Sequence, residues 1–180
     1  TETASSSITV NQVADAITDS LVTDEDTPAS LNVLTNDTFA AGWTLVSVTN
    51  GSNGTVSFLP AGAVTYTPNG DFFGSDSFTY TVTSGGMSET GTVNVTVNPV
   101  NDAPTISGNP IGAVVQGDAY SFIPEFGDVD SDDILTFSIS GAPEWLAINS
   151  ETGELSGNPT NADVGVTRGV VITVSDSVAY

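Results

Sequence analysis

Hydrophobic and polar residues alternate along much of the chain. In the segment 77–83, SFTYTVT, one face of an extended chain carries Phe78, Tyr80 and Val82, and the other face carries threonines. The segments 92–98, 135–140 and 169–175 repeat this period of two, which is typical of strands with one buried face. Asn-Gly and Gly-Gly pairs separate such runs, and no 12-residue window shows a helical period. The pattern predicts an all-β protein built from β-sandwiches.

The strand pattern occurs twice, and similar polar joints mark its boundaries. The segment 9–16, TVNQVADA, resembles the segment 96–103, TVNPVNDA. We therefore expect residues 1–11 to be the last strand of a preceding domain or a linker. Residues 12–99 should form one sandwich, 100–104 a hinge, and 105–180 a second sandwich, each large enough for a small core.

The second predicted domain has no counterpart of the strand at 92–98, which closes the first. Truncation, displacement by an insertion, or donation by another chain would each account for this. The segment 3–10 is a suitable strand for donation at a sheet edge. The expected state is a monomer, with a strand-donated oligomer as the open alternative.

Charge and composition exclude several functions. The chain has 22 acidic residues, Arg168 as its one Lys or Arg, no His and no Cys, and a net charge of −21. It therefore cannot neutralise a nucleic acid or an anionic membrane surface, and it lacks a Ser-His triad, a thiol nucleophile and ordinary zinc ligands. No apolar run is long enough for membrane insertion. The plentiful oxygen ligands suit hard cations, above all Ca2+.

Long stretches resemble known bacterial modules. The segments 24–37, 53–82 and 97–104 resemble the cadherin-like tandem repeats of large secreted adhesins, including the RTX type. The segments 126–165 and 172–176 resemble a dystroglycan-type cadherin-like, or Ig, domain. These resemblances imply two tandem Greek-key β-sandwiches of cadherin/Ig-like type, located outside the cell or on a bacterial surface. They also imply an association with calcium and with polysaccharides.

The resemblance to cadherins implies a calcium site at the joint between the domains. It would take side chains from the first domain, the hinge and the second domain, with the carbonyl groups of Val100 and Ala103. Pro99 stands where cadherin linkers usually begin with Asp, so we expect one or two ions, with a dissociation constant of about 10⁻⁴–10⁻³ M. The implied side-chain ligands are Glu25, Asp76, Asn101, Asp102, Asp128, Asp130 and Asp176.

Neighbouring residues have other expected roles. The acidic run 128–133 is not an EF-hand, because the sixth and twelfth positions are Asp133 and Ile139 instead of Gly and Glu. We expect Asp132 and Asp133 to face solvent, and Trp145 to fill the core of the second sandwich. Stacking of Trp145 on a sugar is the alternative.

The combined expectation is a non-catalytic extender module that calcium stiffens, in a bacterial surface adhesin that mediates cell adhesion or biofilm attachment. Its partners would be neighbouring extender domains, with glycans or cell-surface ligands as further candidates. The alternative is a calcium-dependent carbohydrate-binding or accessory module of an extracellular polysaccharide-degrading enzyme.

Overall fold

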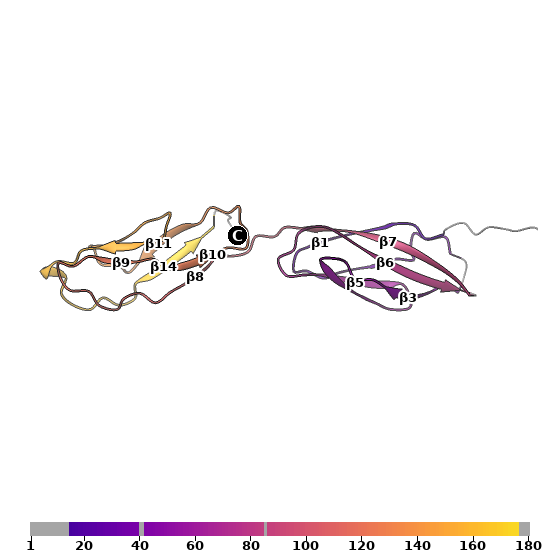
Figure 1. The fold of residues 1–180 in the computed structure, drawn as a ribbon, viewed down its shortest axis with the longest axis horizontal. Helices are drawn as coiled ribbons and strands as arrows, with labels where there is room; N and C mark the ends of the chain where they lie inside the picture. Colours follow the sequence, from indigo (N-terminus) through magenta and orange to yellow (C-terminus); the bar gives the residue numbers. More distant parts are fainter. Residues whose placement is uncertain (1–14, 40–41, 85, 177–180) are drawn as a thin grey trace, which may run out of the picture. The chain divides into compact units, whose positions relative to one another are not determined.

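Two β-sandwich units follow one another along the chain in the computed structural model, which describes residues 15–39, 42–84 and 86–176. The first unit ends at Val100 and the second begins at Asn101. The described residues form strands and one short 3-10 helix (Figure 1), so the prediction of an all-β fold is confirmed. The expected strand within residues 1–11 lies outside the described residues.

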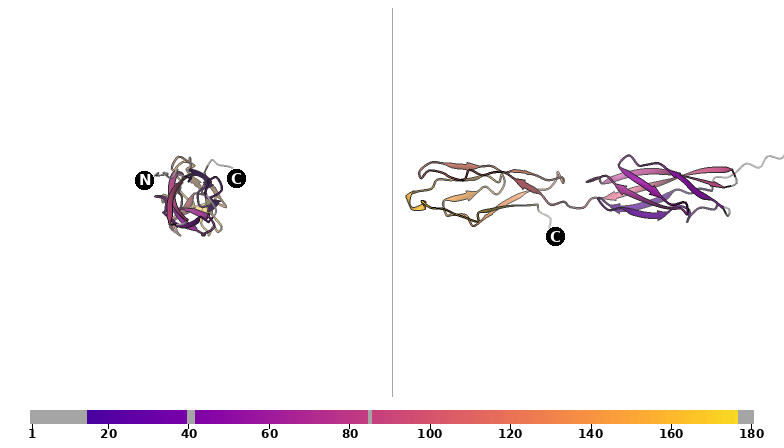
Figure 2. Two further views of the ribbon diagram at one scale, coloured as in Figure 1. Left: turned by 90° about the vertical axis from the view of Figure 1, so that its right-hand side faces the viewer. Right: turned by 90° about the horizontal axis from the view of Figure 1, so that it is seen from below.

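The first unit packs two sheets face to face (Figure 2). One sheet has the order β1-β7-β6-β3, in which β7 is parallel to β1 and antiparallel to β6. The other sheet has the order β2-β5-β4. The strands are β1 (Asp19–Asp24), β2 (Ala29–Asn32), β3 (Thr44–Val48), β4 (Gly54–Phe58), β5 (Ala63–Pro68), β6 (Gly74–Ser84) and β7 (Met87–Asn98).

The core of the first unit follows the alternation in its sequence. Phe78, Tyr80 and Val82 of β6 are buried, as are the alternating valines of β7. Burying one such side chain stabilises the fold by about 1.5–3 kcal/mol. Tyr80 lies opposite Gly91, where an added Cβ would lie 2.2 Å from the Cζ atom of the ring. Glycine at this position therefore makes room for the aromatic ring.

The second unit has shorter strands in the same general arrangement. One sheet has the order β12-β13-β9, β10 pairs with β8, and β11 pairs antiparallel with β14. Pro124, which has no N–H to donate, separates β9 from β10. The elements are β8 (Thr105–Ser107), β9 (Tyr120–Phe122), β10 (Glu125–Gly127), β11 (Thr136–Ser140), β12 (Leu146–Ile148), β13 (Leu155–Gly157), the 3-10 helix η1 (Asn161–Asp163) and β14 (Val171–Ser175).

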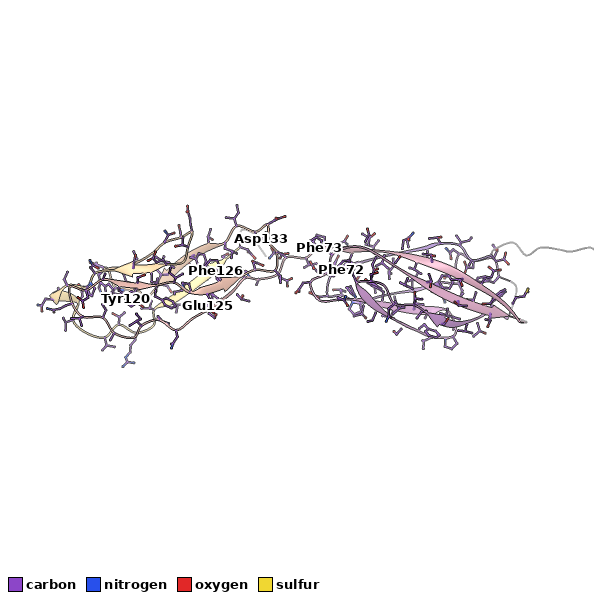
Figure 3. All side chains as sticks on the ribbon, in the orientation of Figure 1. Phe72, Phe73, Tyr120, Glu125, Phe126 and Asp133 are labelled. Carbon is purple, nitrogen blue, oxygen red and sulfur yellow. The ribbon has the colours of Figure 1, made fainter. Side chains whose placement is uncertain are left out.

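The core of the second unit is less completely covered than that of the first. Phe137 and Leu155 are buried. Phe126, labelled in Figure 3, packs edge-on against Phe137 with ring centroids 4.8 Å apart. The inward residues of β14, Ile172 and Val174, are half-buried. The predicted alternation is therefore present, but its inward residues are less buried than those of β6.

Candidate metal centre

Strand pairing gathers three acidic segments at one end of the second unit. Thr105 lies opposite Gly127, and Thr136 lies opposite Ser175. The residues just outside these pairs are 101–104, the loop 128–135, and Asp176. They therefore meet at the same end of the sandwich, although they are distant in the sequence.

Hydrogen bonds connect the three segments. The Asn101 side-chain amide donates to Asp176 Oδ2 at 2.8 Å, and the Asp102 N–H donates to Asp130 Oδ2 at 2.7 Å. The Asp130 N–H donates to Asp128 Oδ1 at 3.1 Å. Five of the seven predicted ligands are thus brought together: Asn101, Asp102, Asp128, Asp130 and Asp176.

Three carboxylates converge within this cluster. Asp128, Asp133 and Asp176 each place one oxygen so that the three oxygens lie within 4.8 Å of one another. Asp176 is 6% exposed. Asp128 Oδ2 and Asp133 Oδ2 are buried without a hydrogen-bond partner. Since a buried carboxylate oxygen needs compensation, these atoms fit a site for a cation.

The expectation that Asp133 faces solvent is wrong. Asp133 is half-buried, and its N–H donates to the Asp130 carbonyl at 3.0 Å, which closes a turn. That turn directs its carboxylate toward Asp128 and Asp176. Asp132, beside it, is exposed as expected. The acidic run was visible in the sequence, but only the path of the loop distinguishes these two neighbours.

The charged groups around Asp133 in the cluster are acidic. Burial, followed by repulsion from Asp130, Asp128 and Asp176, raises the pKa of Asp133 above its ordinary value. Arg168 is the one Lys or Arg in the chain. It precedes β14 whereas Asp176 follows it, and the five residues of this strand span about 13 Å. The arrangement therefore suits a cation with oxygen ligands, such as calcium.

Glu25 and Asp76 belong to the first unit and have other partners. Glu25 is buried, and Val100 N–H donates to its Oε1. Asp76 accepts hydrogen bonds from Tyr66 Oη at 2.8 Å and from three main-chain N–H groups, those of Ser52, Asn53 and Ser77. In the part of the chain that the structure describes, neither belongs to a group of three acidic side chains with converging oxygens.

The bonds to Asp76 give it a local structural role. Partial burial opposes its ionisation, but the hydrogen bonds from Tyr66 and the three N–H groups hold the pKa below its ordinary value. A Cβ added at Gly51 would lie 2.1 Å from Asp76 Oδ2. Asp76 therefore anchors the turn at residues 51–53 as a charged acceptor.

Two family models together match most of the chain. Residues 11–96 match the model described as "Bacterial Ig domain", and residues 103–180 match the model described as "Putative Ig domain". Integrin beta-like protein C of Dictyostelium discoideum is 32% identical over 123 residues, which cover 62% of this chain and 6% of that protein. The chain thus spans a small part of this relative.

Solved cadherin structures share the fold. Drosophila N-cadherin EC1-4 is 16% identical with a TM-score of 0.56, and the match covers 89% of this chain and 44% of that one. Human protocadherin-24 EC1-2 is 14% identical with a TM-score of 0.54, and the match covers 89% and 90%. The expected cadherin/Ig-like sandwiches are confirmed. No helix among the described residues is long and apolar enough to span a bilayer.

Proposed function

Since the chain is a tandem of two Ig-like domains with a cadherin-like fold, we propose that it is a non-catalytic, calcium-binding structural module of an extracellular adhesion protein. Domains of these kinds are usually extracellular. A bacterial surface adhesin of the RTX type, active in cell adhesion or biofilm attachment, is the parent that this tandem favours.

The observation that carries the proposal is the convergence of Asp128, Asp133 and Asp176. Their oxygens lie within 4.8 Å of one another, and two buried oxygens lack a hydrogen-bond partner. Calcium takes six to eight oxygen ligands, carboxylates among them, in flexible geometry. The donor set fits calcium better than zinc or copper, because the chain contains no His and no Cys.

Asn101 and Asp102 give this site its structural effect. They are hydrogen-bonded to Asp176 and Asp130, and they directly follow the last residue of the first unit. Without a cation, the carboxylates repel one another and the cluster opens more readily. A bound ion would remove this repulsion and hold residues 101–102 in place, which would restrict the freedom of the link between the units.

The residues of the cluster are poorly suited to catalysis. The chain has no His or Cys to act as a base or nucleophile. A carboxylate pair could serve in glycoside hydrolysis, but here Asp128, Asp133 and Asp176 converge on one point, and Asn101 donates to Asp176. This favours a structural role for the cluster.

Thermal unfolding with and without calcium tests the proposal. Trp145 fluorescence in a Trp43→Phe background reports on the second unit. With the dissociation constant expected above, 10 mM CaCl2 stabilises this unit by about 1.4–2.7 kcal/mol. That corresponds to a rise in melting temperature of about 6–20 °C relative to EDTA. Asp133→Asn should remove this rise.

Asp132→Asn is the matched control, because it removes the same charge from the exposed neighbour. It should keep the response to calcium, and NaCl at equal ionic strength should not reproduce it. The proposal fails if the wild-type protein melts at the same temperature in CaCl2 and EDTA, or if the two variants respond alike.

A further inference from the structure

Three Asn-Gly pairs lie in the first unit, and the calcium site gives none of them a role. They are Asn50-Gly51, Asn53-Gly54 and Asn69-Gly70. Such pairs are common in turns. They are also the most prone of all dipeptides to lose the side-chain amide, because glycine has no Cβ to keep its main-chain nitrogen away from that amide. The surroundings of each pair therefore decide its reactivity.

Deamidation makes two demands on the local structure. The main-chain nitrogen of the glycine attacks the side-chain amide carbon of the asparagine. A C–N bond forms, and ammonia leaves with the proton that the glycine nitrogen loses. Water then opens the cyclic imide and yields aspartate or isoaspartate. The asparagine side chain must therefore be free to turn, and the main chain at the glycine must be able to open locally.

The pair Asn50-Gly51 is held on both sides. Asn50 Oδ1 accepts a hydrogen bond from the Val56 N–H at 2.9 Å, which fixes the side-chain amide. Gly51 lies against a carboxylate, since an added Cβ would lie 2.1 Å from Asp76 Oδ2. Neither half of the pair can reorient without breaking these contacts, so this pair is protected.

The pair Asn53-Gly54 is held by its main chain. The Asn53 N–H donates to Asp76 Oδ2 at 2.9 Å, and the Asn53 carbonyl accepts from the Asn69 N–H at 2.8 Å. Gly54 begins β4 and is buried, and an added Cβ would lie 2.3 Å from Cζ of the Tyr66 ring. The Gly54 nitrogen is thus fixed in a packed strand, and this pair is protected as well.

The pair Asn69-Gly70 lies in the turn between β5 and β6, and both of its residues are exposed. In the described part of the chain, the main chain of Asn69 makes its hydrogen bonds. One of these closes the turn: Phe72, labelled in Figure 3, donates its N–H to the Asn69 carbonyl at 3.3 Å, which is long for such a bond. Among the described residues, a Cβ added at Gly70 meets Asp26 Oδ1 alone, at 3.9 Å. This pair meets both demands.

We propose that Asn69 is a deamidation site, the one of the three Asn-Gly pairs that converts in the folded chain. Water is the reagent that the reaction consumes, and ammonia is the product that it releases. The new carboxyl group would stand in a turn that already contains Asp71, whose N–H donates to Asp26 Oδ1 at 3.3 Å. The modification therefore adds negative charge where two acidic side chains meet, and it is independent of the calcium site.

Peptide mapping of the 180-residue chain after incubation in warm, mildly alkaline buffer tests this directly. Chymotrypsin cleaves after large apolar and aromatic residues, so Asn69 falls in the peptide 67–72, TPNGDF. Asn50 and Asn53 fall together in 46–58, VSVTNGSNGTVSF, where fragmentation spectra distinguish them. In the folded chain, Asn69 should convert at least about tenfold faster than either. An unincubated sample corrects for conversion during digestion.

The same chain unfolded in urea is the matched control, because the contacts that protect Asn50 and Asn53 are then lost. The three pairs should convert at similar rates there. Gly70→Ala should slow conversion at Asn69 and leave the other two unchanged, and the added Cβ has room in the fold. A difference smaller than tenfold between Asn69 and the other two in the folded chain would overturn the proposal. So would an Asn69 that stays intact while the unfolded chain converts.

Discussion

Individual carboxylates in this chain differ in what surrounds their oxygens. Asp76 accepts four hydrogen bonds. Asp128 and Asp133 each keep a buried oxygen without a partner. Asp19 also has a buried, unpartnered Oδ2, and it faces the charge of Asp37. The hydrogen bonds to Asp76 stabilise its ionised form. The unpartnered oxygens of Asp128 and Asp133 suit a bound cation. The surroundings of Asp19 favour its protonated form.

Asp76→Asn should destabilise the first unit. The amide would present N–H donors to groups that themselves donate, and Tyr66, which is 0% exposed, would lose its charged acceptor. We expect the free energy of unfolding to fall by about 1.5–3 kcal/mol, the usual contribution of a hydrogen bond to a charged group. Urea unfolding followed by Trp43 fluorescence, in a Trp145→Phe background, measures this change.

Asp71→Asn, measured in EDTA, is the matched control for Asp76, because Asp71 is exposed and such substitutions usually change stability by no more than about 0.5 kcal/mol. The loss at Asp76 should be equal in EDTA and in calcium. A loss seen only in calcium would instead make Asp76 a metal ligand.

Asp19 should make the first unit less stable as the pH rises. Burial, followed by repulsion from Asp37, raises its pKa from 3.8 to about 6. The folded state thus holds the proton more tightly than the unfolded chain, so its stabilising contribution is complete below about pH 4 and is lost as the pH rises to about 6. Asp19→Asn should therefore raise the free energy of unfolding at neutral pH by about 2–3 kcal/mol.

The stability difference between Asp19→Asn and the wild-type protein, measured by urea unfolding, should grow from about pH 4 to about pH 6. Asp118→Asn, at an exposed position, should show no such growth. A constant difference across this range would mean that Asp19 is ionised throughout.

At the scale of strands, alternation predicted β6, β7, β11 and β14, because residues two apart share a face and one face of each strand meets the core. It could not predict the short strands β8, β9 and β10, which have three residues each. Their positions depend on pairing with distant strands and on the interruption at Pro124.

The proximity of the candidate residues was predictable to a similar degree. Asn101, Asp102, Asp128, Asp130 and Asp176 lie where strands begin or end, and hydrogen bonds connect them at one end of the second unit. That they bind a metal, together with Glu25 and Asp76, stays a prediction. Asp133 was missed because its orientation depends on the turn closed by its hydrogen bond to Asp130. Strand positions determine which residues are near the site, and loop geometry determines which of them point into it.

The pairing of β6 with β7 depends on the close approach of Tyr80 to Gly91. Gly91→Ala would place a Cβ 2.2 Å from the Tyr80 ring. Overpacking of this kind usually costs about 1–3 kcal/mol, which urea unfolding of the first unit measures. Gly70→Ala, in the same unit, where the nearest atom to an added Cβ lies 3.9 Å away, should cost far less. Equal stability of the two variants would show that the ring moves aside easily.

At the scale of the whole molecule, the dominant property is a net charge of −21 with Arg168 as its one basic side chain. Such a charge attracts cations generally and opposes compaction through self-repulsion. Any monovalent salt relieves this repulsion by screening. Only a site with converging ligands binds a particular ion at a particular place, and the proposed site of this kind is the cluster of Asp128, Asp133 and Asp176.

An NMR titration of the ¹⁵N-labelled, metal-free chain with CaCl2 tests this claim most directly. If calcium binds at the cluster, backbone amide signals of residues 101–102, 128–133 and 176 should shift and saturate, with a dissociation constant of about 10⁻⁴–10⁻³ M. Asp133→Asn should weaken this binding at least tenfold. Absence of saturable shifts, or shifts spread over the acidic surface as in NaCl, would show that the cluster holds no specific calcium ion.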